Sequence, residues 1–168
     1  MNVIFNHHAK KLYFTEIEKN ITIPADSIVR NNDNKLRSLD NPNEVIYTAT
    51  YSKYEKTYPY MPMPLPEGVY HITGAEQLKD QAMIDIFGEY IIYTDAQPEV
   101  EIWDLDFQGG YREPTGEFVK DTGYLIHYSA GPYTLGCIAT HDKTDQYLAF
   151  ELCVHELYHN KTMRLTVV

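Results

Sequence analysis

The chain has 168 residues, 43% hydrophobic and 23% charged, with 14 Lys and Arg against 24 Asp and Glu and a formal net charge of −10. This size and composition suit one folded domain over residues 1–168 and exclude a mainly disordered chain. The acidic balance argues against nucleic acid or an anionic membrane surface as a partner. No apolar run approaches the roughly 18 residues of a membrane span and no secretory signal pattern opens the chain, so we expect no membrane insertion and no Sec export.

Short runs of β-branched and aromatic residues predict a mainly β domain, and 15 Tyr add to the β-forming content. The predicted strands are 3–5, 12–15, 21–23, 45–51, 69–73, 89–94, 100–107, 124–128 and the closing segment 163–168. Polar residues predict a surface loop at 31–44, alternating prolines a structured loop at 58–68, and glycine with charged residues a third loop at 108–123. Segment 129–137 is predicted to be a turn.

Two helices are predicted among these strands. Thr73 and Glu76 have the spacing of a capping box, and the following apolar residues recur every four positions, so we expect a helix over 74–87. From Asp142 the apolar period becomes helical again. The residues predicted to face the core on this second helix are Tyr147, Phe150, Val154 and Leu157. The sequence therefore predicts an α+β fold, mainly β with two helices.

A histidine at the end of a predicted strand and a cysteine ten residues later form the sharpest chemical pattern. An imidazole in contact with a thiol favours the thiolate, so His127 and Cys137 together would make a nucleophile. Gly136 permits a turn in which successive backbone N–H groups stabilise an oxyanion. Ser129 and Thr134 are candidates to orient the imidazole or line an acyl pocket. The alternative is that Cys137 is a small buried hydrophobic residue.

The same segment resembles the catalytic signature of the L,D-transpeptidase (YkuD-type) family, in which a strand histidine precedes a Ser/Thr-x-Gly-Cys-aliphatic turn. The matching residues are His127, Thr134, Gly136, Cys137 and Ile138, with Leu135 at the unspecified position. The segment 62–72, the opening hairpin and the closing helix and strand also resemble parts of those domains. The short spacing, Leu135 and Ala139 depart from the usual pattern and resemble divergent relatives that cleave or modify peptidoglycan stems.

The resemblance implies an L,D-transpeptidase-like β-sandwich and acyl transfer on a peptidoglycan stem peptide, at the bacterial cell wall or in the periplasm. Cys137 would form a thioester, His127 would carry the proton, and water or an amine would resolve the thioester. Tyr128 and Tyr133, with Thr134, are candidates to contact the substrate. This interpretation requires no cofactor and no metal.

Two alternatives remain open. His155, Glu156 and His159 match HExxH, which on a helix places two histidines to bind zinc and a glutamate to act as general base. No His, Asp, Glu or Cys follows His159, so a third ligand would come from upstream. The second alternative is a binding module that has lost turnover and recognises cell-wall fragments or a protein partner.

Overall fold

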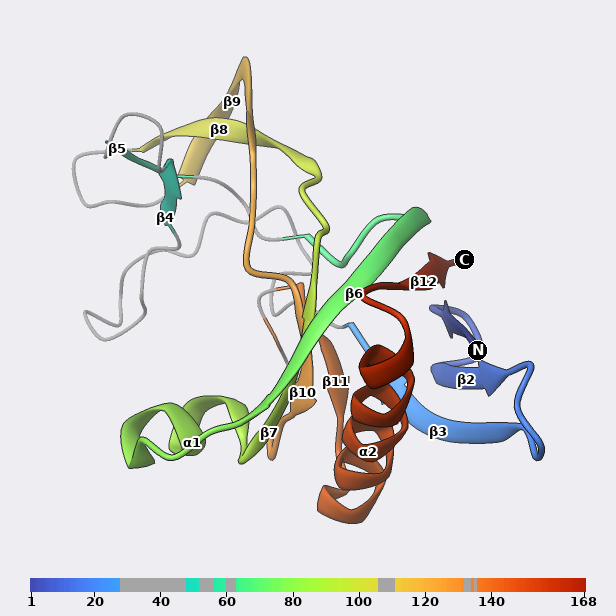
Figure 1. Ribbon diagram of the computed structural model, residues 1–168. Coiled ribbons are helices and arrows are strands. Elements are labelled where there is room, and N and C mark those ends of the chain that lie inside the picture. The colour runs from blue at the N-terminus through green and yellow to red at the C-terminus, as the bar shows by residue number, and fades with distance from the viewer. Residues whose placement is uncertain (28–47, 52–55, 60–62, 106–110, 132–133, 135) are drawn as a thin grey trace.

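The computed structural model describes residues 1–27, 48–51, 56–59, 63–105, 111–131, 134 and 136–168 (Figure 1). Within these residues the chain forms twelve strands and two helices, so the prediction of a mainly β, α+β fold is confirmed. In chain order they are β1 (Asn2–Asn6), β2 (Lys11–Thr15), β3 (Ile21–Asp26), β4 (Thr48–Tyr51), β5 (Lys56–Pro59), β6 (Gly68–Gln77), α1 (Gln81–Phe87), β7 (Tyr90–Thr94), β8 (Glu99–Leu105), β9 (Tyr111–Lys120), β10 (Leu125–Tyr128), β11 (Ile138–Thr140), α2 (Lys143–His159) and β12 (Met163–Val167).

Eight of the strands close into a barrel in the order β1-β12-β6-β7-β10-β11-β3-β2. Two neighbouring pairs, β1 with β12 and β10 with β11, are parallel, and the other neighbouring strands of the barrel pair antiparallel. The strands form a closed barrel rather than the separate layers expected of a sandwich. Among the residues that the structure describes, no helix is both long enough and apolar enough to span a membrane.

Every second side chain of the barrel strands points inward, and these side chains together form one hydrophobic core. In β1 the side chains of Val3 and Phe5 are fully buried, and in β12 those of Leu165 and Val167 are nearly so. This two-residue period is the pattern of strands with one face on the core. Residues Ala149 and Cys153 of α2 belong to the same hydrophobic cluster, so α2 supplies part of the core.

The first helix is shorter than predicted, because its expected N-terminal part continues strand β6. Residues 74–77 pair with β7 after a register shift between Ile72 and Gly74. The carboxylate of Glu76 accepts a hydrogen bond from the Tyr93 hydroxyl instead of capping a helix. The N-cap is Asp80, whose side chain accepts from the backbone N–H of Met83 at 3.1 Å. Strand pairing thus outweighs the local capping pattern.

The second helix was correctly predicted in position, and its buried face was predicted in part, because Phe150 is buried and Leu157 packs against the core. Tyr147 and Val154, predicted to face the core, are 45% and 40% exposed. The buried residues are Gln146, Ala149, Phe150 and Cys153. The stripe i, i+3, i+4, i+7 is present, but it begins one residue earlier and includes a polar side chain.

The loop predicted at 108–123 is mostly strand β9, which pairs with β8 as a two-stranded ribbon. This ribbon lies beside β4 and β5, at the end of the molecule away from α1 and α2 (Figure 1). Most of the described side chains of β9 are exposed, so this strand lacks the buried alternation that identifies strands in a sequence. The predicted loop at 31–44 lies outside the described residues.

Candidate functional site

The parallel pairing of β10 and β11 brings the candidate nucleophile and base to one face of the sheet. Ile126 of β10 pairs with Ile138 of β11, and both side chains lie in the core. Successive side chains of a strand point to opposite faces, so His127 and Cys137 both turn away from that core. Although ten residues separate them in sequence, His127 and Cys137 therefore lie on the same face of the sheet.

His127 and Cys137 line the same cleft, whose volume is about 340 Å³. Helix α1 and the β9–β10 connection supply most of the other walls. The complete lining is Ile86, Phe87, Asp121, Thr122, Gly123, Tyr124, His127, Ser129, Thr134 and Cys137. A cleft of this size, with an imidazole and a thiol on its surface, has the dimensions of a small-molecule or peptide site.

The imidazole of His127 is held in one orientation. Its Nδ1 lies 2.8 Å from the backbone oxygen of Tyr128, which can only accept, so Nδ1 carries the hydrogen and Nε2 is left as the acceptor. The ring of Phe87 packs edge-on against it, with centroids 5.5 Å apart. Burial lowers the pKa of His127, and the charge of nearby His141 lowers it further. A neutral imidazole with a free Nε2 is the form needed for a general base.

The thiol of Cys137 is protonated in this arrangement. The residue is buried, and burial raises the pKa of the thiol to about 11, with a further rise from the nearby carboxylate of Asp121. The sulfur accepts a hydrogen bond from the N–H of Leu125 at 3.4 Å and lies 3.6 Å from the backbone oxygen of Gly123, to which it donates. The pair of groups is therefore neutral, not the thiolate and imidazolium expected from the sequence, and no hydrogen bond joins the two side chains in the part of the structure described.

Gly136 forms the turn that presents the cysteine. Its φ of +115° is a conformation that residues with a Cβ rarely adopt. A Cβ at this position would collide with the backbone oxygen of Met63 and lie 2.7 Å from Cε1 of Tyr124. Ser27 donates to the Gly136 oxygen at 2.7 Å and accepts from Leu65 N–H at 3.2 Å. The turn is thus fixed by a required glycine and by a hydroxyl distant in sequence.

Thr134 and Ser129 line the cleft, but their hydroxyl groups serve local structure. Thr134 Oγ1 donates to the backbone oxygen of Cys137 at 2.9 Å and accepts from the N–H of Gly136 at 3.1 Å. The Gly136 N–H, expected to stabilise an oxyanion, is therefore already occupied. Ser129 Oγ donates to the oxygen of Gly131 at 3.1 Å, and the imidazole is oriented by the backbone instead of either hydroxyl.

The structure places a second histidine, His141, near His127, and the sequence analysis did not select it. Its Nδ1 lies 3.0 Å from the Ser129 oxygen and its Nε2 3.0 Å from Oδ1 of Asp26. The second contact is an ion pair without hydrogen-bond geometry, so this buried Asp26 oxygen has no hydrogen-bond partner among the described residues. With both ring nitrogens protonated, His141 would interact with the Ser129 oxygen on one side and with the Asp26 carboxylate on the other, and so connect the segment after His127 to β3. In the sequence, the only indication of such a role for His141 was that it is a second histidine close after His127, the histidine at the end of a strand.

Of the two tyrosines predicted to contact the substrate, Tyr128 does not line this cleft. Tyr128 follows His127 in β10, so its side chain turns to the other face of the sheet and lines a different cavity. Tyr133 lies outside the described residues. Asp121 is a buried cleft residue that the sequence analysis missed, because it lies within the segment 108–123 that was predicted to be a loop.

The HExxH residues lie near the C-terminal end of α2. His155 and His159 are exposed, with ring centroids 5.3 Å apart. Glu156 accepts from the amino group of Met1 at 3.1 Å and from the side chain of Asn160 at 3.2 Å. No group of three His, Cys, Asp or Glu side chains that could hold a metal is found in the residues the structure describes. Both cysteines are free, and burial raises the pKa of Cys153 to about 12.

Comparisons of the chain with protein-family models, with curated proteins and with solved structures give no significant match.

Proposed function

We propose that this chain is a cysteine-dependent acyl transferase or peptidase that acts on peptidoglycan stem peptides. The observation that carries the proposal is the position of Cys137 and His127 on one wall of a cleft of about 340 Å³, with the imidazole Nε2 free to accept a proton. The resemblance of the segment 127–138 to the L,D-transpeptidase family supplies the substrate class. We also propose that the barrel is a divergent form of that family's β-sandwich.

The neutral state of both groups favours a mechanism in which the proton moves as the nucleophile attacks. Cys137 Sγ forms a bond to the carbonyl carbon of the stem peptide, and its proton passes to Nε2 of His127. The tetrahedral intermediate then expels the amine, which takes that proton from Nε2, and a thioester remains. Water or a second amine attacks the thioester, with His127 again accepting and returning the proton. Water as the acceptor makes a peptidase and an amine makes a transpeptidase.

The walls of the cleft fit this reaction. Ile86 and Phe87 give one side of the cleft an apolar surface, and Ser129 and Thr134 give the other side polar atoms. A low-dielectric site strengthens the hydrogen bonds that orient a bound peptide. Because the Gly136 N–H is bound to Thr134, other donors or a shift of the turn must stabilise the oxyanion.

Turnover of a synthetic stem tetrapeptide, followed by mass spectrometry, tests the proposal. We expect Cys137→Ala to abolish turnover and His127→Gln to lower kcat/KM by about a hundredfold or more. Cys153→Ala is the matched control, because Cys153 is also a buried thiol but belongs to the part of α2 that packs in the core. Equal turnover by the wild type and Cys137→Ala would refute the proposal.

The high pKa of Cys137 specifically favours the second candidate, a stem-peptide binding module without turnover. Such a module would bind the tetrapeptide with the same affinity in the wild type and in Cys137→Ala and would release no product from either. Isothermal titration calorimetry alongside the turnover assay distinguishes the two functions.

A further inference from the structure

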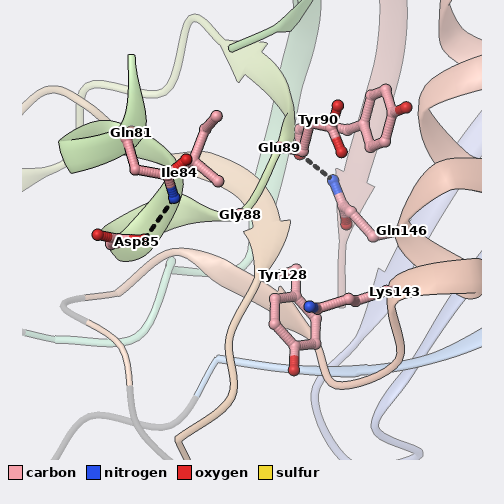
Figure 2. A pocket seen from close by; sticks show the side chains of 9 residues that line it. All are labelled: Gln81, Ile84, Asp85, Gly88, Glu89, Tyr90, Tyr128, Lys143 and Gln146. Atoms are coloured by element: carbon pink, nitrogen blue, oxygen red, sulfur yellow. Dashed lines mark hydrogen bonds between the residues drawn. The ribbon is translucent and has the colours of Figure 1, made fainter. Parts of the chain in front are cut away.

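A second cavity lies on the other face of strand β10, between helices α1 and α2 (Figure 2). Its volume is about 350 Å³. The lining residues are Gln81, Ile84, Asp85, Gly88, Glu89, Tyr90, Tyr128, Lys143 and Gln146. This volume is at the lower end of the range of small-molecule sites, about 300–1,000 Å³, so it suits a ligand of amino-acid or dipeptide size.

The cavity contains charges of both signs that do not pair with each other. Lys143, the first residue of α2, extends over the ring of Tyr128, with Nζ 5.6 Å from the ring centre. Asp85 and Glu89 line the same cavity, yet neither makes an ion pair with Lys143 in the described part of the chain. Opposite charges held around one cavity without contact favour a ligand that carries both charges itself.

Each carboxylate is oriented by one hydrogen bond and keeps its second oxygen for another partner. Oδ1 of Asp85 accepts from Gln81 Nε2 at 2.8 Å, a bond drawn in Figure 2, and Oε1 of Glu89 accepts from Gln77 Nε2 at 2.8 Å. The buried amide of Gln146 is fully engaged with the backbone oxygens of Tyr90 and Ile126 and with Thr140, so it forms a wall and not a ligand contact. The groups available to a ligand are therefore one ammonium and two carboxylates.

We propose that this cavity binds a small zwitterion, a free amino acid or dipeptide, with its carboxylate at Lys143 and its ammonium group at Asp85 and Glu89. The ring of Tyr128 lies next to Lys143 on the wall of the cavity (Figure 2) and would give the ligand an aromatic surface. This site does not depend on the proposed function, because none of its charged groups lines the cleft of Cys137.

The C-terminal end of α1 connects the two sites. Phe87 packs on His127 in the Cys137 cleft, while the next residue, Gly88, lies against Tyr128 in the second cavity. A Cβ on Gly88 would lie 3.0 Å from Cβ of Tyr128, so the backbone approach is close. Helix α1 has no buried residue of its own, and a ligand that holds Asp85 also holds the helix that places Phe87 on the imidazole. Binding in the second cavity therefore alters access to Cys137.

Titration of the protein with L-alanine, D-alanine and L-alanyl-L-alanine, followed by two-dimensional NMR, tests this proposal. We expect saturable shifts of the cavity residues, and affinity lower by about tenfold or more for Lys143→Gln and for the double variant Asp85→Asn, Glu89→Gln. Lys161→Gln and Glu18→Gln remove exposed charges elsewhere and should bind as the wild type does. The single-residue and dipeptide arms identify which of the two ligands is preferred.

Three results would overturn the inference. The first is no saturable shift with any of the zwitterions. The second is equal affinity for acetate or ethylammonium, each of which carries only one of the two charges. The third is an unchanged alkylation rate of Cys137 at saturating zwitterion, which would refute the connection through α1, whereas we expect that rate to change at least twofold. None of these measurements requires turnover of a stem peptide, so failure of the proposed function would not affect them.

Discussion

The reactivity of Cys137 should rise steeply with pH and remain low at neutral pH. With a pKa of about 11, roughly one thiol in 10⁴ is ionised at pH 7. An ordinary cysteine with a pKa of about 8.5 is ionised to about 3%, so alkylation of Cys137 should be slower by about 300-fold at the same access. The rate should increase about tenfold for each pH unit up to about pH 10.

Iodoacetamide labelling between pH 6 and pH 10, with mass mapping of each cysteine, measures this dependence. Cys153 is an internal control, because burial raises its pKa to about 12 and it should label more slowly than Cys137. Protein unfolded in urea should label at the rate of an ordinary thiol at both positions. Selective labelling of Cys137 that reaches a plateau below pH 8 would refute the neutral pair and restore the thiolate and imidazolium expected from the sequence.

Three further predictions concern the turn, the base and stability. Gly136→Ala should lower the free energy of unfolding, measured in urea, by about 3 kcal/mol or more, because the new Cβ would sit on a residue with positive φ and collide with its neighbours. Gly116→Ala is the control: its φ is also positive, at +77°, but the space around it is open, so the loss should be only about 1 kcal/mol. His141→Gln removes a charge that lowers the pKa of His127, so that pKa should rise in NMR titrations; an unchanged value would contradict this electrostatic effect of His141. The pKa of each buried thiol is higher in the folded state than the value of about 8.5 in the unfolded state, so above that pH the unfolded state loses protons that the folded state keeps. The free energy of unfolding should therefore fall above pH 9, by up to about 1.4 kcal/mol per pH unit for each buried thiol. The fall should be less steep in Cys153→Ala.

The barrel strands could be predicted because their side chains alternate between core and exterior. Val3 and Phe5 in β1 and Leu12 and Phe14 in β2 are fully buried at every second position, and this period is visible in the sequence. Strand β9 could not be predicted in the same way, because both of its faces are largely exposed and Pro114 and Gly116 resemble loop residues. Whether a strand could be recognised in the sequence therefore depended on the alternation of buried and exposed side chains, more than on the β-propensity of its residues.

Local helix signals were misleading where pairing with a distant strand decided the structure. Thr73 and Glu76 have the spacing of a capping box, but β7 pairs with this segment, and Asp80 caps the helix instead. In α2 the buried amide of Gln146 replaces the apolar residue that periodicity expected, because Thr140 and two backbone oxygens satisfy it. The two backbone oxygens belong to Tyr90 of β7 and Ile126 of β10, which are distant from Gln146 in sequence, so the helical period of α2 does not contain this information.

At the candidate site, the sequence predicted the groups but not their protonation. His127 and Cys137 were identified from residue type and spacing, and the parallel pairing of β10 with β11 gives them a common face. The neutral state depends on burial and on Asp121 and His141, which come from other parts of the chain. The same alternation places Tyr128 on the opposite face, away from the substrate role predicted for it.

The most direct test of the proposed function is the mass of the intact protein after brief reaction with a synthetic stem tetrapeptide and acid quenching. The account predicts an acyl adduct that maps to Cys137, is absent in Cys137→Ala and persists in Cys153→Ala. Absence of any adduct together with absence of product, under conditions in which the tetrapeptide binds, would contradict the acyl-transfer mechanism.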